Sequence, residues 1–441
     1  AGGAGGSGTI ILAFRNDTSA PLATIRGIVN VTQPEHGTCY AFCSSGTFTP
    51  KEDLVLLHAL VVGGGGSGGW MVGGGGGGGG VVSLGYLKDG KKTVLKKGTT
   101  YSITVGAGGG NRVAGDLSSS GTSRGKTECV DGLPGEPSSL TIGGQVYTAQ
   151  GGGYGGSWFL WDEGTKKGAD GKYVPGGVGA CGGGSAEQTG PGVAGTAGGA
   201  GGASTNTAAG GGGGMCGAGG DGREVAADNL ISGDGGAGFA SGITGTTVIY
   251  GAGGGGGGQK GESGRNVAAG NAGGASAGAG GYGTVGGDAL PNTGSGGGGG
   301  GLFKWDTMYR GGNGGSGTVI LSVMTVADFD RDIGSRGFIV DGEHTVSKRS
   351  KDYVVTLKSS GSLKAFSKLK ILRALVVGGG GSGGWMVGGG GGGGEVVEYR
   401  PEKGSELRLN KGDACAVTVG AGGGNRVAGD LSSSSTSRGY T

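Results

Sequence analysis

The chain has few of the residues on which catalysis, nucleic-acid binding and membrane insertion depend. Charged residues make up only 15% of its 441 residues, aromatic residues make up 6%, and there are three histidines. The formal net charge of +3 leaves no basic stripe for a nucleic acid. No apolar run approaches the roughly 18–20 residues that span a bilayer. We therefore expect neither a nucleic-acid partner nor membrane insertion.

Recognisable catalytic and ligand-binding motifs are also missing. His36, His58 and His344 have no cysteine or carboxylate at metal-ligand spacing. Strings such as "GGGGSGG" match G-x-G-x-x-G by chance, and none continues into a helix or into G-K-[ST]. No Ser/His/Asp set and no carboxylate pair stands out. The sequence thus predicts a protein that is not an enzyme and has no catalytic residue, metal site or cofactor.

Glycine is what the chain has in excess. It accounts for 127 residues, about four times the usual share, and residues 73–80 are all glycine. Ordering a glycine costs ~0.5–1 kcal/mol more than ordering an alanine. Because large side chains are scarce, backbone hydrogen bonds between neighbouring segments, worth a net ~0.5–1.5 kcal/mol each, must offset that cost. Extended left-handed three-residue helices allow such lateral bonding, so a side chain at a central position such as Gly255 should disrupt it.

The chain also repeats itself. The block "ALVVGGGGSGGWMV" occurs twice, and other blocks recur at similar offsets. The clearest pairs are Trp70 with Trp385, Thr104 with Thr418 and Leu12 with Leu321, whose numbers differ by 315, 314 and 309. This period is typical of tandem repeats. We expect the chain to be a window of about 1.4 units from a longer array.

The repeat predicts five parts and an all-β fold. They are the end of a preceding glycine-rich domain (1–8), a small β domain (9–58), a complete glycine-rich domain of packed polyglycine II helices (59–317), a second small β domain (318–373) and the start of the next glycine-rich domain (374–441). Residues 9–62 and 318–377 should fold alike. The segment before Val376 has a helix-like period, but its repeat contains Pro50, so both copies are predicted to be strands. Little or no α-helix and a fibrous architecture are expected.

The order of these blocks resembles a known family. "YAFCSSGTFTP", "GTTYSITVGAGGG" and the closing "GGNGGSGTVILSV" are similar to the glycine-rich domain of phage tail-fibre adhesins and related giant bacterial surface proteins. The resemblance covers residues 40–323. It implies a β segment that leads into a sandwich of packed polyglycine helices, at the cell surface, outside the cell or on a virion. A tail tip should occur once at a chain end, whereas this domain recurs, which favours a shaft or fibre.

Aromatic residues gather where the glycine blocks must turn round. The candidate binding or interface residues are Trp70, Tyr154, Trp158, Phe159, Trp161, Phe303, Trp305, Tyr309 and Trp385. Exposed aromatic side chains on loops stack on sugars or anchor protein partners. They would equally well cap the ends of glycine helices or connect units, and the sequence favours this structural interpretation.

The six cysteines leave their pairing open. Cys39 and Cys43 lie four residues apart on a predicted strand, so their Cα atoms would be ~13 Å apart, too far for a bridge. Cys129, Cys181 and Cys216 lie in or beside the glycine-rich domain, and Cys415 lies in the next one. Extracellular disulfides are favoured slightly over free thiols.

Two functional hypotheses follow. The first is a structural repeat protein of an extracellular filament or surface fibre, whose partners are neighbouring repeats or copies of itself. The second is a phage or cell-surface adhesin that binds a carbohydrate or protein receptor through its aromatic loops. The recurrence of the domain favours the first hypothesis.

Overall fold

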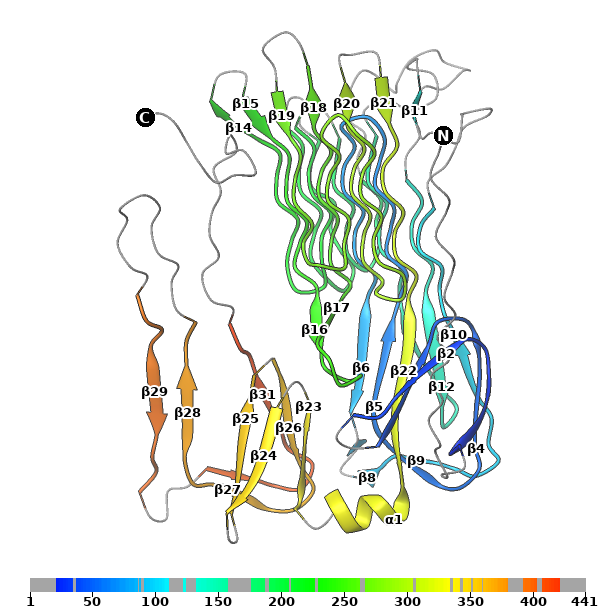
Figure 1. Cartoon of the computed structure of the whole chain (residues 1–441), viewed down its shortest axis with the longest axis vertical. Helices are drawn as coiled ribbons and strands as arrows, with labels where there is room; N and C mark the ends of the chain where they lie inside the picture. Colours follow the sequence, from blue (N-terminus) through cyan, green and yellow to red (C-terminus); the bar gives the residue numbers. More distant parts are fainter. Residues whose placement is uncertain are drawn as a thin grey trace, which may run out of the picture.

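The structure is a computed structural model, and eighteen stretches of it are described. They are residues 21–34, 37–85, 87–88, 91–110, 122–123, 132–157, 176–186, 190–205, 208–226, 229–261, 266–303, 307–333, 336–341, 344–349, 352–358, 360–379, 392–402 and 407–420. Figure 1 shows a β region at one end of the molecule, a bundle of extended glycine segments above it, and short strands at the far end.

Two antiparallel sheets form the β region. The first has the order β1 (Ala23–Arg26), β4 (Gly46–Pro50), β10 (Tyr101–Thr104), β12 (Ser138–Ile142) and β13 (Gln145–Ala149). The second has the order β2 (Val29–Thr32), β3 (Thr38–Phe42), β22 (Thr318–Thr325), β5 (Leu54–Val62) and β6 (Val81–Gly85), and β9 (Val94–Leu95) also pairs with β5. Alternating apolar residues from both sheets face one another, as in a β-sandwich.

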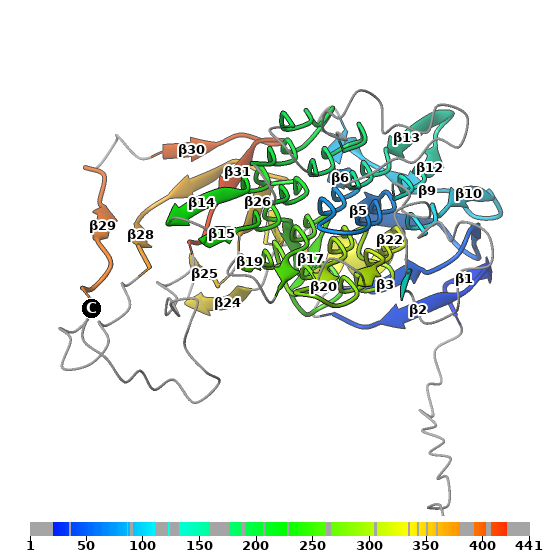
Figure 2. The same ribbon diagram turned by 90° about the horizontal axis from the view of Figure 1, so that it is seen from above.

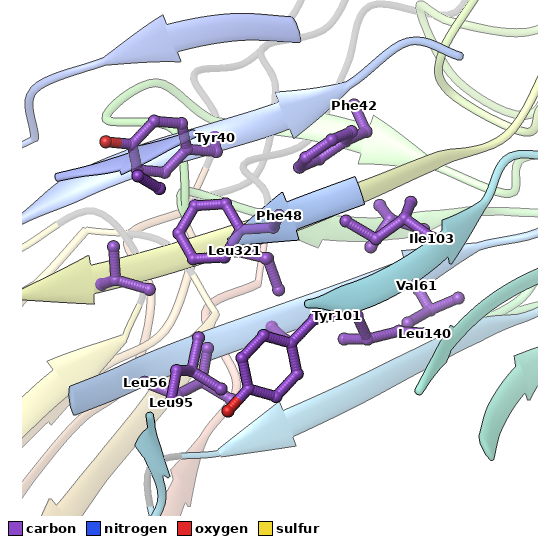
Figure 3. Packing of buried hydrophobic residues seen from close by; sticks show 14 of the residues in the cluster. Tyr40, Phe42, Phe48, Leu56, Val61, Leu95, Tyr101, Ile103, Leu140 and Leu321 are labelled. Carbon is purple, nitrogen blue, oxygen red and sulfur yellow. The ribbon is translucent and has the colours of Figure 1, made fainter. Parts of the chain in front are cut away.

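The sandwich core supplies most of the apolar burial in this region. Figure 3 shows Tyr40, Phe48 and Leu321 meeting between the sheets. The rings of Tyr40 and Phe48 pack edge to face with centroids 5.1 Å apart, an arrangement that the aromatic quadrupole favours. Leu321 comes from β22, after the glycine segments between residues 63 and 317, whereas Tyr40 comes before them. The core therefore forms only when the two ends of this unit meet.

The position of β22 corrects one predicted assignment. Residues 318–373 were predicted to form the second small β domain. Instead β22 lies at the centre of the first unit's second sheet, with Val319 opposite both Phe42 and Val61. The remainder of the five-part division stays a prediction.

Strands of the sandwich continue directly into glycine segments. β5 leads into residues 63–69, which turn back as residues 73–80 into β6. Residues 63–80 are all buried. Viewed from above in Figure 2, the glycine segments appear end on as small coils packed side by side. The sheets therefore set the starting positions of the glycine segments.

Hydrogen bonding between the glycine segments follows a period of three residues. Every backbone N–H of residues 63–69 donates to another segment, and each third residue donates to the same neighbour. Residues 63, 66 and 69 donate to the carbonyls of 80, 77 and 74; residues 64 and 67 donate to 136 and 133; residues 65 and 68 donate to 315 and 312. An extended helix with three residues per turn presents its backbone groups in this way.

The segment of residues 73–80 lies at the centre of this network. All eight of its N–H groups donate, and it bonds to six neighbouring segments in total. It donates to residues 294–300, 150–156 and 210–213, and it accepts from residues 63–69, 254–257 and 181–184. A flat sheet pairs a strand with only two neighbours. This segment is bonded on all sides, which accounts for the backbone groups that burial would otherwise leave unpaired.

A seven-stranded sheet lies at the opposite end of the glycine segments from the sandwich (Figure 1). Its order is β11 (Thr122–Ser123), β21 (Thr307–Tyr309), β20 (Leu302–Phe303), β18 (Gln259–Lys260), β19 (Asn266–Ala268), β15 (Asn229–Ile231) and β14 (Arg223–Ala226). Two further hairpins are β7 (Leu87–Lys88) with β8 (Lys91–Lys92) and β16 (Phe239–Ser241) with β17 (Val248–Tyr250).

The second β unit follows a short helical link. Thr325 caps α1 (Val326–Asp328), which continues as a π-helical turn from Phe329 to Ile333. The strands of the unit are β23 (Phe338–Asp341), β24 (His344–Arg349), β25 (Asp352–Leu357), β26 (Gly361–Ala365), β27 (Leu369–Ile371), β28 (Ala374–Val377), β29 (Val396–Tyr399), β30 (Leu407–Leu409) and β31 (Ala414–Val417). The described residues are thus nearly all β or extended, which confirms the predicted all-β class with little α-helix.

Strand pairing in the second unit repeats the register of the first. In the first unit Val29 lies opposite Phe42. The residues 315 positions later, His344 and Leu357, also lie opposite each other, and 315 is the offset between Trp70 and Trp385. The same offset relates the pairs β1–β4 and β23–β26, and the pairs β5–β6 and β28–β29. The pair β5–β9 corresponds to β27–β30, and the pair β4–β10 corresponds to β26–β31. In both, the earlier strand is shifted by 315 residues and the later strand by 314, the offset between Thr104 and Thr418.

Candidate functional site

The end of the glycine segments farthest from the sandwich carries the candidate site. There Trp70, Met71 and Val72 form the turn between residues 63–69 and 73–80. The three side chains are buried and form a small core with others from the far sheet and its neighbours: Ala209, Leu302 and Met308. Apolar burial in the glycine region is thus concentrated where its segments reverse.

This turn is held by specific hydrogen bonds. The backbone N–H of Trp70 donates to Ser157 Oγ at 2.8 Å, and the N–H of Met71 donates to the Tyr309 carbonyl at 3.1 Å. Met71 and Val72 have φ angles of 51° and 50°. Left-handed backbone is costly for residues other than glycine, above all for a β-branched one such as Val72. Burial of the Trp70 cluster offsets this strain.

The structure places only some of the aromatic candidates. Trp70 is completely buried, so it packs inside the protein and offers no surface to a ligand. Tyr154, Phe303 and Tyr309 are half-buried. An added Cβ at Gly177 would come within 2.3 Å of the Tyr154 ring. Tyr154 therefore packs closely against a neighbouring glycine segment. Trp158, Phe159, Trp161, Trp305 and Trp385 lie outside the described residues.

Both aromatic segments of the sequence join the structure at the same end. Ser157, which precedes residues 158–175, bonds to Trp70. Phe303 and Thr307, on either side of residues 304–306, are opposite each other in the β20–β21 hairpin, whose Leu302 packs in the Trp70 cluster. The described residues that flank these two segments, although far apart in the sequence, thus lie beside one turn. Nothing in the sequence pattern alone predicts this convergence.

A buried polar side chain in β18 was missed by sequence reasoning. Gln259 is fully buried, and neither its amide oxygen nor its amide nitrogen has a hydrogen-bond partner. It lies opposite Leu302, a member of the Trp70 cluster. A lone glutamine within "GGGGGGQKG" carries no signal that would have marked it.

Gln259→Met is expected to raise the free energy of unfolding by about 1–3 kcal/mol. The substitution keeps a similar shape but removes two buried polar groups that lack partners, each of which carries a desolvation cost in the folded state. Urea unfolding of the two proteins measures the difference. Lys260→Met, at the exposed neighbouring position, is the matched control and should change stability by less than about 0.5 kcal/mol. A loss of stability in Gln259→Met would contradict the prediction.

None of the cysteines in the part of the chain that the structure describes forms a disulfide, which corrects the preference for disulfides. These cysteines are Cys39, Cys43, Cys181, Cys216 and Cys415; Cys129 lies outside the described residues. Burial raises the pKa of the Cys181 thiol to about 12. Burial also raises the pKa of Cys216, but that residue is exposed at the surface.

Alkylation of the native protein at pH 8 should modify Cys216 at least about 100-fold faster than Cys181. Only the thiolate reacts, and a thiol with a pKa near 12 is about one part in 10⁴ ionised at that pH. Peptide mass spectrometry after timed exposure to iodoacetamide gives both rates. Protein unfolded in urea is the control, in which the two rates should become similar. Rapid native labelling of Cys181 would show that the glycine segments around it open readily.

Other chemistry-bearing side chains do not gather into a site among the described residues. No group of three or more His, Cys, Asp or Glu residues there could hold a metal ion. His58 Nε2 and Ser83 Oγ are 2.7 Å apart in a cross-strand contact between β5 and β6. Within the same residues, none of the helices has the length and apolar character needed to cross a bilayer.

Comparison with known proteins identifies one family. Residues 43–324, more than half of the chain, match the model of a family described as a glycine-rich domain. The match begins beside β3 and ends within β22, so it takes in the glycine segments together with most strands of the first sandwich. No curated protein matches the chain.

Proposed function

Since this chain belongs to the glycine-rich domain family, we propose that it is a non-enzymatic structural protein of an extracellular filament or surface fibre. In this proposal stiff glycine-rich domains alternate with β domains along the fibre. The partners are neighbouring repeats or further copies of the chain.

One observation carries the proposal: the three-residue period of hydrogen bonds that ties residues 73–80 to six neighbours. We infer that the glycine segments are packed polyglycine II helices, because only a threefold extended helix without Cβ atoms bonds laterally in this way. An added Cβ at Gly75 or Gly76 would lie 2.0 or 2.1 Å from a neighbouring carbonyl oxygen. A lattice this close leaves its segments little freedom to bend separately, which suits a load-bearing rod.

The second candidate function is receptor binding by an adhesin. The residues that flank the two aromatic segments, Ser157 on one side and Phe303 and Thr307 on the other, lie beside the Trp70 turn and its cluster, and this favours it, since aromatic residues on loops suit the capture of a carbohydrate or protein receptor. The two functions are compatible in one fibre, but they predict different losses when the aromatic residues are removed.

Electron microscopy of the purified chain, together with a receptor or glycan binding assay, separates the two functions. A structural protein should form elongated particles that persist in the variant Trp158→Ala/Trp161→Ala/Trp305→Ala. An adhesin should lose receptor binding in that variant while its shape is unchanged. Globular monomers that bind a receptor would overturn the fibre proposal and leave the adhesin.

A further inference from the structure

Among the described residues, the second β unit has no counterpart of the strand that completes the first. In the first unit β22 lies between β3 and β5 and pairs with both. Their counterparts in the second unit are β25 and β28. In the part of the chain that the structure describes, β25 pairs only with β24, and β28 pairs only with β29. The sheet is therefore divided at the position where the first unit has β22.

This division leaves apolar side chains exposed. Leu60, Val61 and Val62 of β5 are completely buried, whereas their counterparts in β28, Leu375, Val376 and Val377, are 62%, 63% and 62% exposed. Val354 of β25 is 44% exposed, although its counterpart Cys39 is buried. An exposed apolar strand with an open edge is a template for pairing with another chain.

The sequence of a fitting strand occurs elsewhere in this chain. Residues 5–14, "GGSGTIILAF", are identical at seven of ten positions to residues 314–323, "GGSGTVILSV", which contain the start of β22. The differences keep an apolar residue at the two positions equivalent to Val319 and Val323, both of which are buried in the first core. Residues 5–14 thus carry the pattern that would complete the divided sheet of the second unit.

We propose that residues 5–14 of a second copy of this chain insert between β25 and β28 and complete the second sandwich. The pairing of β22 fixes the register. Thr318 lies opposite Val62 and Ile320 opposite Leu60, so Thr9 of the donor copy pairs with Val377 and Ile11 with Leu375. On the other edge, Val319 lies opposite Phe42, so Ile10 of the donor copy pairs with Leu357.

This interface joins unlike surfaces of two copies, head to tail. Each copy donates residues 5–14 at one interface and offers β25 and β28 at another. Unlike surfaces joined in this way build an open filament unless the rotation between copies closes a ring. Strand donation of this kind derives its affinity from main-chain hydrogen bonds and its specificity from alternate side chains. The inference rests on the proposed structural function and deepens it by naming the contact between copies.

A complementation experiment with the full chain tests the interface. Ile10→Asp damages the donor strand and leaves the acceptor intact, and Val376→Asp damages the acceptor and leaves the donor intact. Val376 is exposed in the single chain, so its substitution should not unfold the protein. Val178→Asp, at a position 67% exposed in a glycine-rich segment, is the matched control. Sedimentation velocity over a wide range of protein concentrations measures the mean mass of the oligomers and so the association state.

The unmodified chain and Val178→Asp should form oligomers whose mean mass grows with concentration. Ile10→Asp and Val376→Asp should each be monomeric, with association weakened at least about 100-fold. A 1:1 mixture of these two variants should form a dimer and nothing larger, since it retains one intact donor and one intact acceptor.

Three results would overturn the proposed interface. One is unchanged association of either aspartate variant. Another is the absence of a dimer in the mixture. The third is an unmodified chain that stays monomeric, as it would if residues 5–14 folded back onto their own second unit. If filaments of the unmodified chain also persist in both variants under the electron microscope, the strand interface fails and the structural function stands.

Discussion

Gly76→Ala is expected to lower the free energy of unfolding by at least about 3 kcal/mol. The new Cβ would lie 2.1 Å from the Gly66 carbonyl oxygen and 2.6 Å from its carbon, both of which are backbone atoms that cannot rotate away. Ordinary van der Waals contact begins at 3.4 Å, so the two segments must move apart. That movement strains the bonds of residue 76 to Gly297 and Gly254. Overpacking alone costs about 1–3 kcal/mol, and each broken hydrogen bond adds ~0.5–1.5 kcal/mol.

Gly110→Ala is the matched control. No atom lies within 4 Å of a Cβ added there, and its φ is outside the left-handed region. Replacing such a glycine should stabilise the protein by up to about 1 kcal/mol, because the unfolded chain loses conformational freedom. Urea denaturation of both variants and the unmodified chain measures the contrast. Equal effects at the two positions would show that the glycine segments are not closely packed.

The need for close packing could be predicted from composition. Glycine at 127 positions cannot be ordered by side-chain burial, so backbone bonds between segments had to be the main source of stability. The predicted disruption at Gly255 follows the same reasoning, and in the structure a Cβ there would lie 2.2 Å from the Gly270 carbonyl oxygen. The close lateral packing of the glycine segments is thus a consequence of the missing Cβ atom of glycine.

The neighbours within the lattice could not be predicted. Residues 73–80 bond to segments from residue 63 to residue 300, and a glycine segment has no side chain that would specify its partner. The sandwich strands and the apolar turns supply that information, because they fix where each segment begins and ends. For the same reason the central position of β22 was missed: its apolar sequence predicts a buried strand but says nothing about its order in the sheet.

The candidate site was predicted only in part. Aromatic residues between glycine blocks predicted turns; of those that the structure describes, Trp70 lies in a turn and Phe303 and Tyr309 lie in a hairpin, whereas Tyr154 lies within the bonded segment of residues 150–156. Whether each is buried depends on contacts between segments far apart in sequence, such as that of Trp70 with Met308. No local pattern encodes such contacts. The unpartnered Gln259 was invisible for the same reason.

Trp70→Ala is expected to cost about 3–5 kcal/mol of stability, the range for removing a completely buried large aromatic side chain. Its burial helps to hold Met71 and Val72 at left-handed φ angles, so its loss also weakens the turn that starts residues 73–80. Trp70→Phe should cost less, about 1–2 kcal/mol, because an aromatic ring is retained and the cavity is smaller. The indole Nε1 also has no hydrogen bond to lose. Thermal and urea unfolding of the two variants give these values.

Tyr282→Ala separates a structural role for Trp70 from a general sensitivity to aromatic loss. Tyr282 lies in the glycine-rich region and is 39% exposed. Its removal should cost only about 1 kcal/mol, the typical effect of a substitution that leaves no buried cavity. If Trp70→Ala were no more harmful than Tyr282→Ala, the Trp70 cluster would not anchor the turn. A large loss at Trp70 alone would mean that the lattice depends on its apolar end as well as on its backbone bonds. Residues 73–80 would then depend on the buried Trp70 cluster, which glycines have no side chains to form, to keep their position among six neighbours.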